Sequence, residues 1–255
     1  FSVTHGFGSG GVIVSGHVRD AGDYRGPDGT VLNSGSADRG VLARVERRVG
    51  SALVAISWQS DFGRDIERPR NNSSSVRFYS PYEDSHRFNA TYERTSVAGL
   101  AAVRLSGFVG SSDQRSDQDR VSTPTRARDI VRADVSARDF QFRATGEKTV
   151  GGARLEFGAD INGRAGLEAH DIIVQYDLAG AVVSSTDNLS IDAARRTDTG
   201  FFLQADTPLT KRLTAAGGVR VDRVANVNTG GYFGDRSVSH GAGAGFAAIT
   251  AGGEG

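Results

Sequence analysis

The chain has 255 residues and a formal net charge of zero, from 30 basic and 30 acidic side chains. Without a basic excess it shows no nucleic-acid footprint, and without cysteine it has neither a disulfide framework nor a zinc–cysteine cluster. No apolar run approaches the length of a transmembrane helix, although a mean hydropathy of −0.33 is compatible with alternating strands that cross a membrane.

The first half of the chain predicts strands in which apolar and polar residues alternate. Phe1–Gly11 resembles the tail of a strand whose start precedes it. Further strands are expected around Val12–Val18, Val41–Val45, Ala52–Trp58, Phe88–Tyr92 and Ala101–Val109. The polar segments between them are expected to be long loops: Tyr24–Asp38, Phe62–Asp84 and Ser111–Thr125.

The second half continues the pattern. Val131–Val135 and Phe140–Ala144 alternate on opposite phases, so a bulge is expected near Arg138 and Asp139. The remaining strands are Ala153–Ile161, a hairpin over Thr199–Arg223, and a last strand near Ser239–Thr250. Gly163–Arg196 is expected to be the longest loop, with a small hairpin formed by Ile172–Leu178 and Ala181–Ser184.

Short turns near residues 49, 98, 149 and 209 alternate with the long loops. Together with about ten strands of roughly 9–12 residues, this asymmetry predicts an all-β fold, an antiparallel transmembrane β-barrel segment with short periplasmic turns and long extracellular loops. We expect residues 1–255 to form one partial barrel domain, which on its own is an open curved sheet.

The arginines decide which side of these strands meets hydrocarbon. An arginine facing lipid at mid-bilayer costs roughly 2–4 kcal/mol in a barrel, and several together would consume most of the roughly 5–15 kcal/mol that stabilises a domain. The apolar side should therefore face lipid or a dry core, and the charged side a wet lumen. The expected lumen-facing residues are Arg44, Glu46, Arg104, Arg154, Glu156, Gln204, Asp206, Arg220 and Asp222.

Several stretches resemble the barrel of a TonB-dependent outer-membrane receptor. They are YRGPDGTVLNSG, RLEFGADINGRAGLEA, DTGFFLQADTPLTKRLTAAGGVRVDR and GGYFGD, which begin at Tyr24, Arg154, Asp198 and Gly230. Within the third, Gln204 and Asp206 precede a short turn and a Gly218-x-Arg220-x-Asp222 strand, a pattern that recurs in this family.

The resemblance implies active uptake of a scarce, large ligand across the outer membrane of a Gram-negative bacterium, without enzymatic activity. A ferric siderophore is the expected ligand, with haem and cobalamin as the family's other cargoes. Energy comes through TonB, which pulls on a plug domain. The chain shows no plug, no TonB box and about half the strands of such a barrel, so we interpret it as an internal barrel fragment.

Ligand contact is expected from the polar segment Phe62–Asp84 and from the aromatic pair near residue 232. Guanidinium groups can meet an anionic chelate, and aromatic rings can stack on it. The candidate residues are Arg64, Arg68, Arg70, Arg77, Tyr79, Tyr82, Tyr232 and Phe233. The alternative interpretations of these residues are a solvated loop, loop packing, or contact with lipopolysaccharide phosphate. Outer-membrane lipid and lipopolysaccharide are expected partners.

No metal site, cofactor or catalytic group is expected. Asp113, Asp117 and Asp119 lack the glycine and glutamate of an EF-hand loop, and Arg115 and Arg120 lie close enough to neutralise them. Two other functions remain open. One is a passive porin or autotransporter barrel. The other is a soluble β-sandwich or propeller that binds glycans, in which a second layer of protein would cover the side bearing Leu155 and Phe157.

Overall fold

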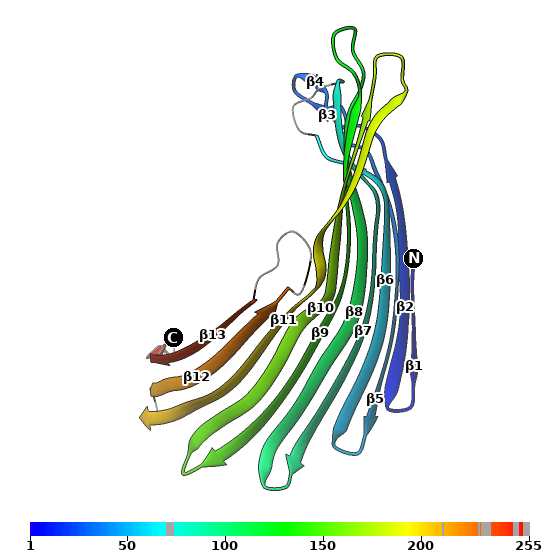
Figure 1. The fold of residues 1–255 in the computed structure, drawn as a ribbon. Coiled ribbons are helices and arrows are strands. Elements are labelled where there is room, and N and C mark those ends of the chain that lie inside the picture. The colour runs from blue at the N-terminus through cyan, green and yellow to red at the C-terminus, as the bar shows by residue number, and fades with distance from the viewer. Residues whose placement is uncertain (70–73, 211, 229, 231–235, 247–249, 252–255) are drawn as a thin grey trace.

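The computed structural model describes residues 1–69, 74–210, 212–228, 230, 236–246 and 250–251. Most of them form a single antiparallel sheet of 12 strands, which is curved and open (Figure 1). Along the sheet each strand pairs with its neighbours in the order β1-β2-β5-β6-β7-β8-β9-β10-β11-β12-β13, and β14 adds to β12. No helix in the described part of the chain is long and apolar enough to cross a membrane.

The strands of the main sheet are unequal in length. Their bounds are β1 Ser2–Phe7, β2 Gly10–Ala21, β5 Ser36–Val49, β6 Ala52–Glu67, β7 Val76–Val97, β8 Leu100–Arg120, β9 Asp129–Val150, β10 Ala153–Tyr176, β11 Val182–Thr210, β12 Leu213–Val227, β13 Arg236–Phe246 and β14 Thr250–Ala251. A separate two-stranded hairpin joins β3 Arg25–Gly26 to β4 Gly29–Thr30 inside the predicted loop Tyr24–Asp38.

Tight turns join the strands at one end of the sheet, as predicted near residues 49, 98 and 149. Gly50 and Gly99 have φ of 60° and 79°, a left-handed conformation that glycine adopts without strain. At the fourth predicted turn, Thr210 pairs with Leu213 across a gap of two residues. In Figure 1 these turns lie at the bottom, whereas the upper ends of the strands rise and twist together.

Three segments predicted as loops are largely strand, which corrects the sequence interpretation. β6 continues to Glu67 and β7 begins at Val76, β8 continues to Arg120, and β10 and β11 pair through Gly163–Arg196 up to Tyr176. These parts of β6 to β11 are called the extensions below. The small hairpin expected within Gly163–Arg196 is present, since Gln175 pairs with Ser184 and Tyr176 with Val182. The other extensions were missed because a strand with polar residues on both faces loses its alternation, while its backbone ladder continues.

The predicted bulge in β9 is also absent. β9 pairs with β8 without interruption from Asp129 to Glu147, and the irregularity lies in β10, between Ala165 and Glu168. Val131 and Phe142 simply point to opposite faces of one regular strand. The apolar residues change phase along β9 because the half near the tight turns carries them on one face and the other half carries them on the opposite face.

The strand register defines two faces. The apolar face carries Phe157, Leu203 and Val221, and the polar face carries the residues that alternate with them. On β8 the apolar face runs from Ala101 to Val109, which for a tilted strand is roughly 20 Å and close to the roughly 25 Å apolar band of outer-membrane barrels.

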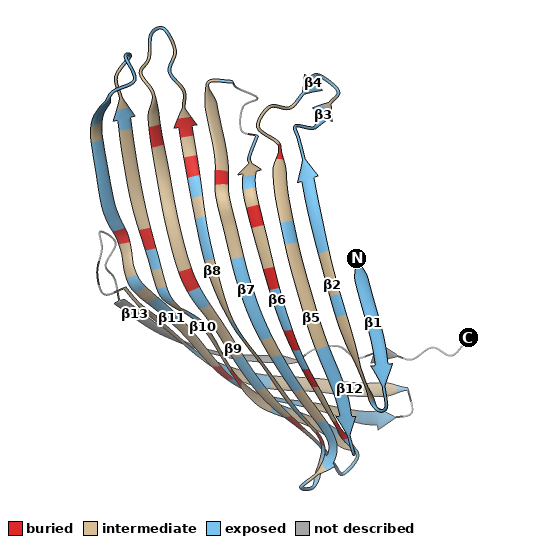
Figure 2. Cartoon of the chain, turned by 90° about the vertical axis from the view of Figure 1, so that its right-hand side faces the viewer, coloured by how far each residue is buried: buried red, intermediate tan, exposed pale blue. Residues whose placement is uncertain are grey.

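The sheet is a single layer, and the described residues include no second layer that covers either face (Figure 2). Phe157 and Leu203 remain 39% and 46% exposed, and the buried apolar residues are five alanines and Ile130. A sheet of this kind has no dry core, so the soluble-sandwich alternative is wrong. The open barrel segment expected from the sequence is confirmed.

Candidate functional site

The nine residues predicted to face a lumen all lie on the polar face. Glu156 pairs with Gln204, Arg154 with Asp206, and Gly200 with Asp222, and the alternation of β5 and β8 places Arg44, Glu46 and Arg104 on the same side. Whether this side encloses a lumen is a prediction about the complete barrel.

Ion pairs on the polar face run from strand to strand. Arg104 on β8 reaches Glu93 on β7 at 3.3 Å and Glu147 on β9 at 4.0 Å. Glu147 in turn accepts from Arg154 on β10 at 2.9 Å. Each charge is paired with its opposite, so the charged face carries little net field there.

Arg220 makes the longest of these connections. From β12 it crosses β11 and donates two hydrogen bonds of 2.9 Å to Asp160 on β10, and its Nε donates to Asp222 at 2.8 Å. Between them lies Gly200, where a Cβ would collide with Nη2 of Arg220. A glycine at this point of β11 therefore allows the guanidinium to span three strands. Beside this bridge, Arg143 stacks over Phe202 at 4.9 Å.

A cavity of about 780 Å³ is lined largely by the polar face above these pairs. Arg164 donates to both oxygens of Asp139 at 2.8 and 3.0 Å, and Arg196 is bonded to Asp198 at 3.1 Å. Arg87 lies 4.6 Å over the ring of Phe108, is exposed, and makes no ion pair with another residue in the described ranges. Sequence reasoning missed these residues, although Arg87 alternates with the apolar Phe88 and so shares the phase of the other polar-face residues.

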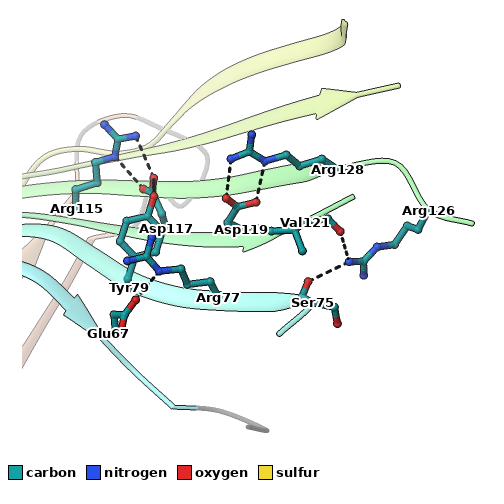
Figure 3. A network of polar contacts seen from close by, with 10 residues as sticks. All are labelled: Glu67, Ser75, Arg77, Tyr79, Arg115, Asp117, Asp119, Val121, Arg126 and Arg128. Carbon is teal, nitrogen blue, oxygen red and sulfur yellow. Dashed lines mark hydrogen bonds and ion pairs between the residues drawn. The ribbon is translucent and has the colours of Figure 1, made fainter. Parts of the chain in front are cut away.

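The extensions carry a second polar network, shown in Figure 3. Asp117, whose side chain is 3% exposed, accepts from Arg115 at 2.8 and 3.1 Å, and Arg132 lies 3.5 Å away. Arg128 donates to both oxygens of Asp119 at 3.0 and 2.7 Å. Hydrogen bonding to Asp119 raises the pKa of Arg128. The guanidinium of Arg128 therefore stays charged at any physiological pH.

The predicted ligand residues of Phe62–Asp84 are also paired. Arg64 forms a bidentate pair with Asp84, Arg68 pairs with Glu83, and Arg77 donates to Glu67 at 2.6 Å while stacking over Tyr79 at 4.2 Å. Burial raises the pKa of Tyr79 and of Tyr82, so both phenols stay neutral.

These residues do not form one cluster. Arg64 pairs in register with Tyr82, and Tyr82 with Arg115, which continues the phase of the apolar face. Arg77 and Tyr79 lie on that side as well, opposite Asp119 and Asp117. Arg68 reaches Glu83 on the polar-face side. The remaining candidates, Arg70, Tyr232 and Phe233, lie outside the described residues.

No group of three or more histidine, aspartate or glutamate side chains in the described ranges is arranged to hold a metal ion. Asp117 and Asp119, two members of the acidic run considered above, are neutralised by Arg115 and Arg128.

Comparison with known families shows to which family this chain belongs. The model of the family described as TonB dependent receptor-like, beta-barrel, matches residues 12–251. The chain belongs to the TonB-dependent receptor family. The passive-porin alternative is therefore overturned, and the resemblance seen in the sequence is confirmed.

Solved structures show the same fold for this receptor barrel. The copper transporter OprC superposes with a TM-score of 0.71 at 14% identity, over 94% of this chain and 38% of that one. The FrpB iron transporter from Neisseria meningitidis, F3-3 variant, has a TM-score of 0.61 at 16% identity, over 96% and 40%. The chain thus spans about two fifths of their length. No curated protein matches the chain.

Proposed function

We propose that the receptor barrel forms part of an outer-membrane active transporter that imports a metal chelate, a ferric siderophore, with energy supplied through TonB. The observation that carries this proposal is the division of one curved sheet into an apolar and a charged face, with tight turns at one end and long extensions at the other. Membership of the receptor family and the fold shared with copper and iron transporters support it.

A chelate suits these residues better than a bare metal ion. The sequence contains neither cysteine nor methionine, the soft ligands preferred by Cu(I). The polar face instead offers guanidinium groups and aromatic rings, which bind anionic and planar groups.

Arg87 is the strongest candidate for contact with the chelate. Its guanidinium is exposed and stacked on Phe108 in the cavity of the polar face, and no described carboxylate is paired with it. Four of the other candidates face the opposite side of the sheet, where contact with lipopolysaccharide fits them better: Arg64, Arg77, Tyr79 and Tyr82. Arg68, Arg70, Tyr232 and Phe233 stay as proposed ligand contacts.

Binding and uptake of a ferric tris-catecholate and a ferric hydroxamate test the proposal. One of the two chelates should bind the wild-type receptor. We expect Arg87→Ala to weaken binding of that chelate by about tenfold or more, the loss expected for a hydrogen bond to a charged group. Arg48→Ala is the matched control, because Arg48 lies on the same face at the opposite end of the sheet.

Uptake should cease in cells that lack TonB. Uptake that continues without TonB would contradict active transport, and equal binding by the Arg87 and Arg48 variants would contradict the proposed contact.

A further inference from the structure

The apolar face is interrupted by a hollow of about 520 Å³ between β6 and β9. Its floor is formed by Ala90 on β7 and Gly107 on β8, which pair directly in register. Ile56 and Phe142 stand at either end of this row, since they pair with Ala90 and Gly107.

Bulky residues close the hollow along the strands. Tyr92 and Leu105 form the neighbouring pair toward the tight turns, and Phe88 and Val109 form the pair toward the extensions. Two small residues thus lie within a ring of large ones. The lining is almost entirely carbon, and the hollow is within the size range of ordinary ligand pockets.

Arg138 lies just above the hollow. It is two residues from Phe140, which lines the hollow, so on regular β9 it is the next side chain of the same face toward the extensions. It is exposed, and its side chain makes no hydrogen bond or ion pair with another described residue.

Its neighbours on the same face do not neutralise it. Ser111 and Ala165 pair with it in register, and His86 in the same row bonds to Ser60. Asp113, one row further out, pairs in register with Ser136. Arg64 and Arg115, on the same side, are each paired with an aspartate.

We propose that the hollow and Arg138 together bind one phosphorylated membrane lipid, with an acyl chain over Ala90 and Gly107 and the phosphate at the Arg138 guanidinium. The site matches both parts of such a lipid. The apolar hollow suits an acyl chain, and the guanidinium of Arg138 beside it suits a phosphate. The inference rests on the proposed function, because only a membrane-embedded sheet presents this face to lipid.

The test uses the full-length receptor, folded in neutral detergent and titrated with phosphorylated lipid A, dephosphorylated lipid A and phosphatidylglycerol, with bound lipid counted by native mass spectrometry. Arg138→Gln removes the anchor, and Ala90→Phe fills the hollow while keeping the face apolar. Val221→Phe is the control, since Val221 lies on the apolar face of β12, away from the hollow.

We expect one phosphorylated lipid A per wild-type receptor, about tenfold weaker binding by Arg138→Gln and by Ala90→Phe, and unchanged binding by Val221→Phe. Dephosphorylated lipid A should bind the wild-type receptor as weakly as phosphorylated lipid A binds the Arg138→Gln variant. If phosphatidylglycerol binds equally well, and its binding is lost in the same two variants, the site accepts any phosphorylated lipid.

Binding that ignores the phosphate, or that survives in both variants, would overturn the lipid site. Failure of the proposed function looks different, because chelate uptake would then continue in cells that lack TonB while lipid binding stays unchanged. A wild-type protein that stays monodisperse without detergent would contradict the lipid-facing sheet on which the site depends.

Discussion

Gly200 and Arg220 show how one residue without a side chain permits a bridge across three strands. A Cβ at position 200 would meet only the flexible end of Arg220 and lie 2.6 Å from Asp222 Oδ1, so the backbone of β11 need not move. The substitution would instead displace the guanidinium from Asp160, whose side chain is 9% exposed.

We predict that Gly200→Ala lowers the free energy of unfolding by about 1–2 kcal/mol, because the partly exposed Arg220 leaves Asp160 without its partner. Arg220→Gln should cost about the same, and the double variant no more than either, since both remove one bridge. Urea unfolding of the vesicle-inserted receptor measures this. Gly6→Ala, where a Cβ would meet nothing within 4 Å, is the control. Additive costs would refute the shared cause.

His170 is the residue whose charge should respond to pH in the extensions. Nδ1 lies 3.0 Å from Asp187 and Nε2 3.1 Å from Glu168, and hydrogen bonds to these two carboxylates raise the pKa of His170. Across from it in β9 stands Asp134, which is 3.9 Å from Arg115.

Because the folded-state pKa is raised, the imidazolium stabilises the β10–β11 hairpin fully below the unfolded pKa of about 6.5, and this contribution is lost as pH rises through the folded pKa. We predict that NMR titration of His170 gives a pKa above the ordinary histidine value of about 6.5 and that Asp187→Asn lowers it. A pKa unchanged by Asp187→Asn would contradict the assigned cause.

At the scale of the strand, alternation decides which substitutions a membrane tolerates. Leu203 and Gln204 are consecutive on β11, yet they point to opposite faces. Leu203 is 46% exposed on the apolar side, and Gln204 lies 3.4 Å from Asp206 on the polar side.

We predict that Leu203→Arg lowers the stability of the vesicle-inserted receptor by about 2–4 kcal/mol, because a guanidinium in hydrocarbon is poorly solvated. Gln204→Arg should cost less than about 1 kcal/mol, since its neighbours are already polar. Insertion and urea unfolding of the two variants measure the difference. Equal costs would mean that β11 does not separate lipid from water.

At the scale of the whole molecule, the sheet has two edges, formed by β1 and β13. A free edge presents unpaired backbone groups and recruits other strands. Within β1, Val3 is 63% exposed on the edge itself.

Residues 1–255 produced alone should therefore associate in detergent, and Val3→Lys should reduce the association, because edge lysines discourage strand addition. Light scattering measures the oligomer mass. A monodisperse monomer of the wild-type polypeptide would show that the edges are closed in another way.

The sequence by itself determined the class of the fold and which side of each alternating strand is apolar. Alternation such as that of Leu155, Glu156 and Phe157 is imposed by contact of one face with an apolar medium, so it is local and can be read from the chain. The tight turns were equally local, because they depend on glycines such as Gly50.

Only the tertiary structure decided what lies beyond the apolar part of the sheet and which side chains meet. Extensions such as residues 111–120 of β8 are held by the ladder with neighbouring strands, so their residues need not alternate. The separation of Arg68 from Arg64, and the approach of Arg220 to Asp160, depend on register across several strands. Register is a property of the sheet, since it is fixed by pairing between segments far apart in the chain.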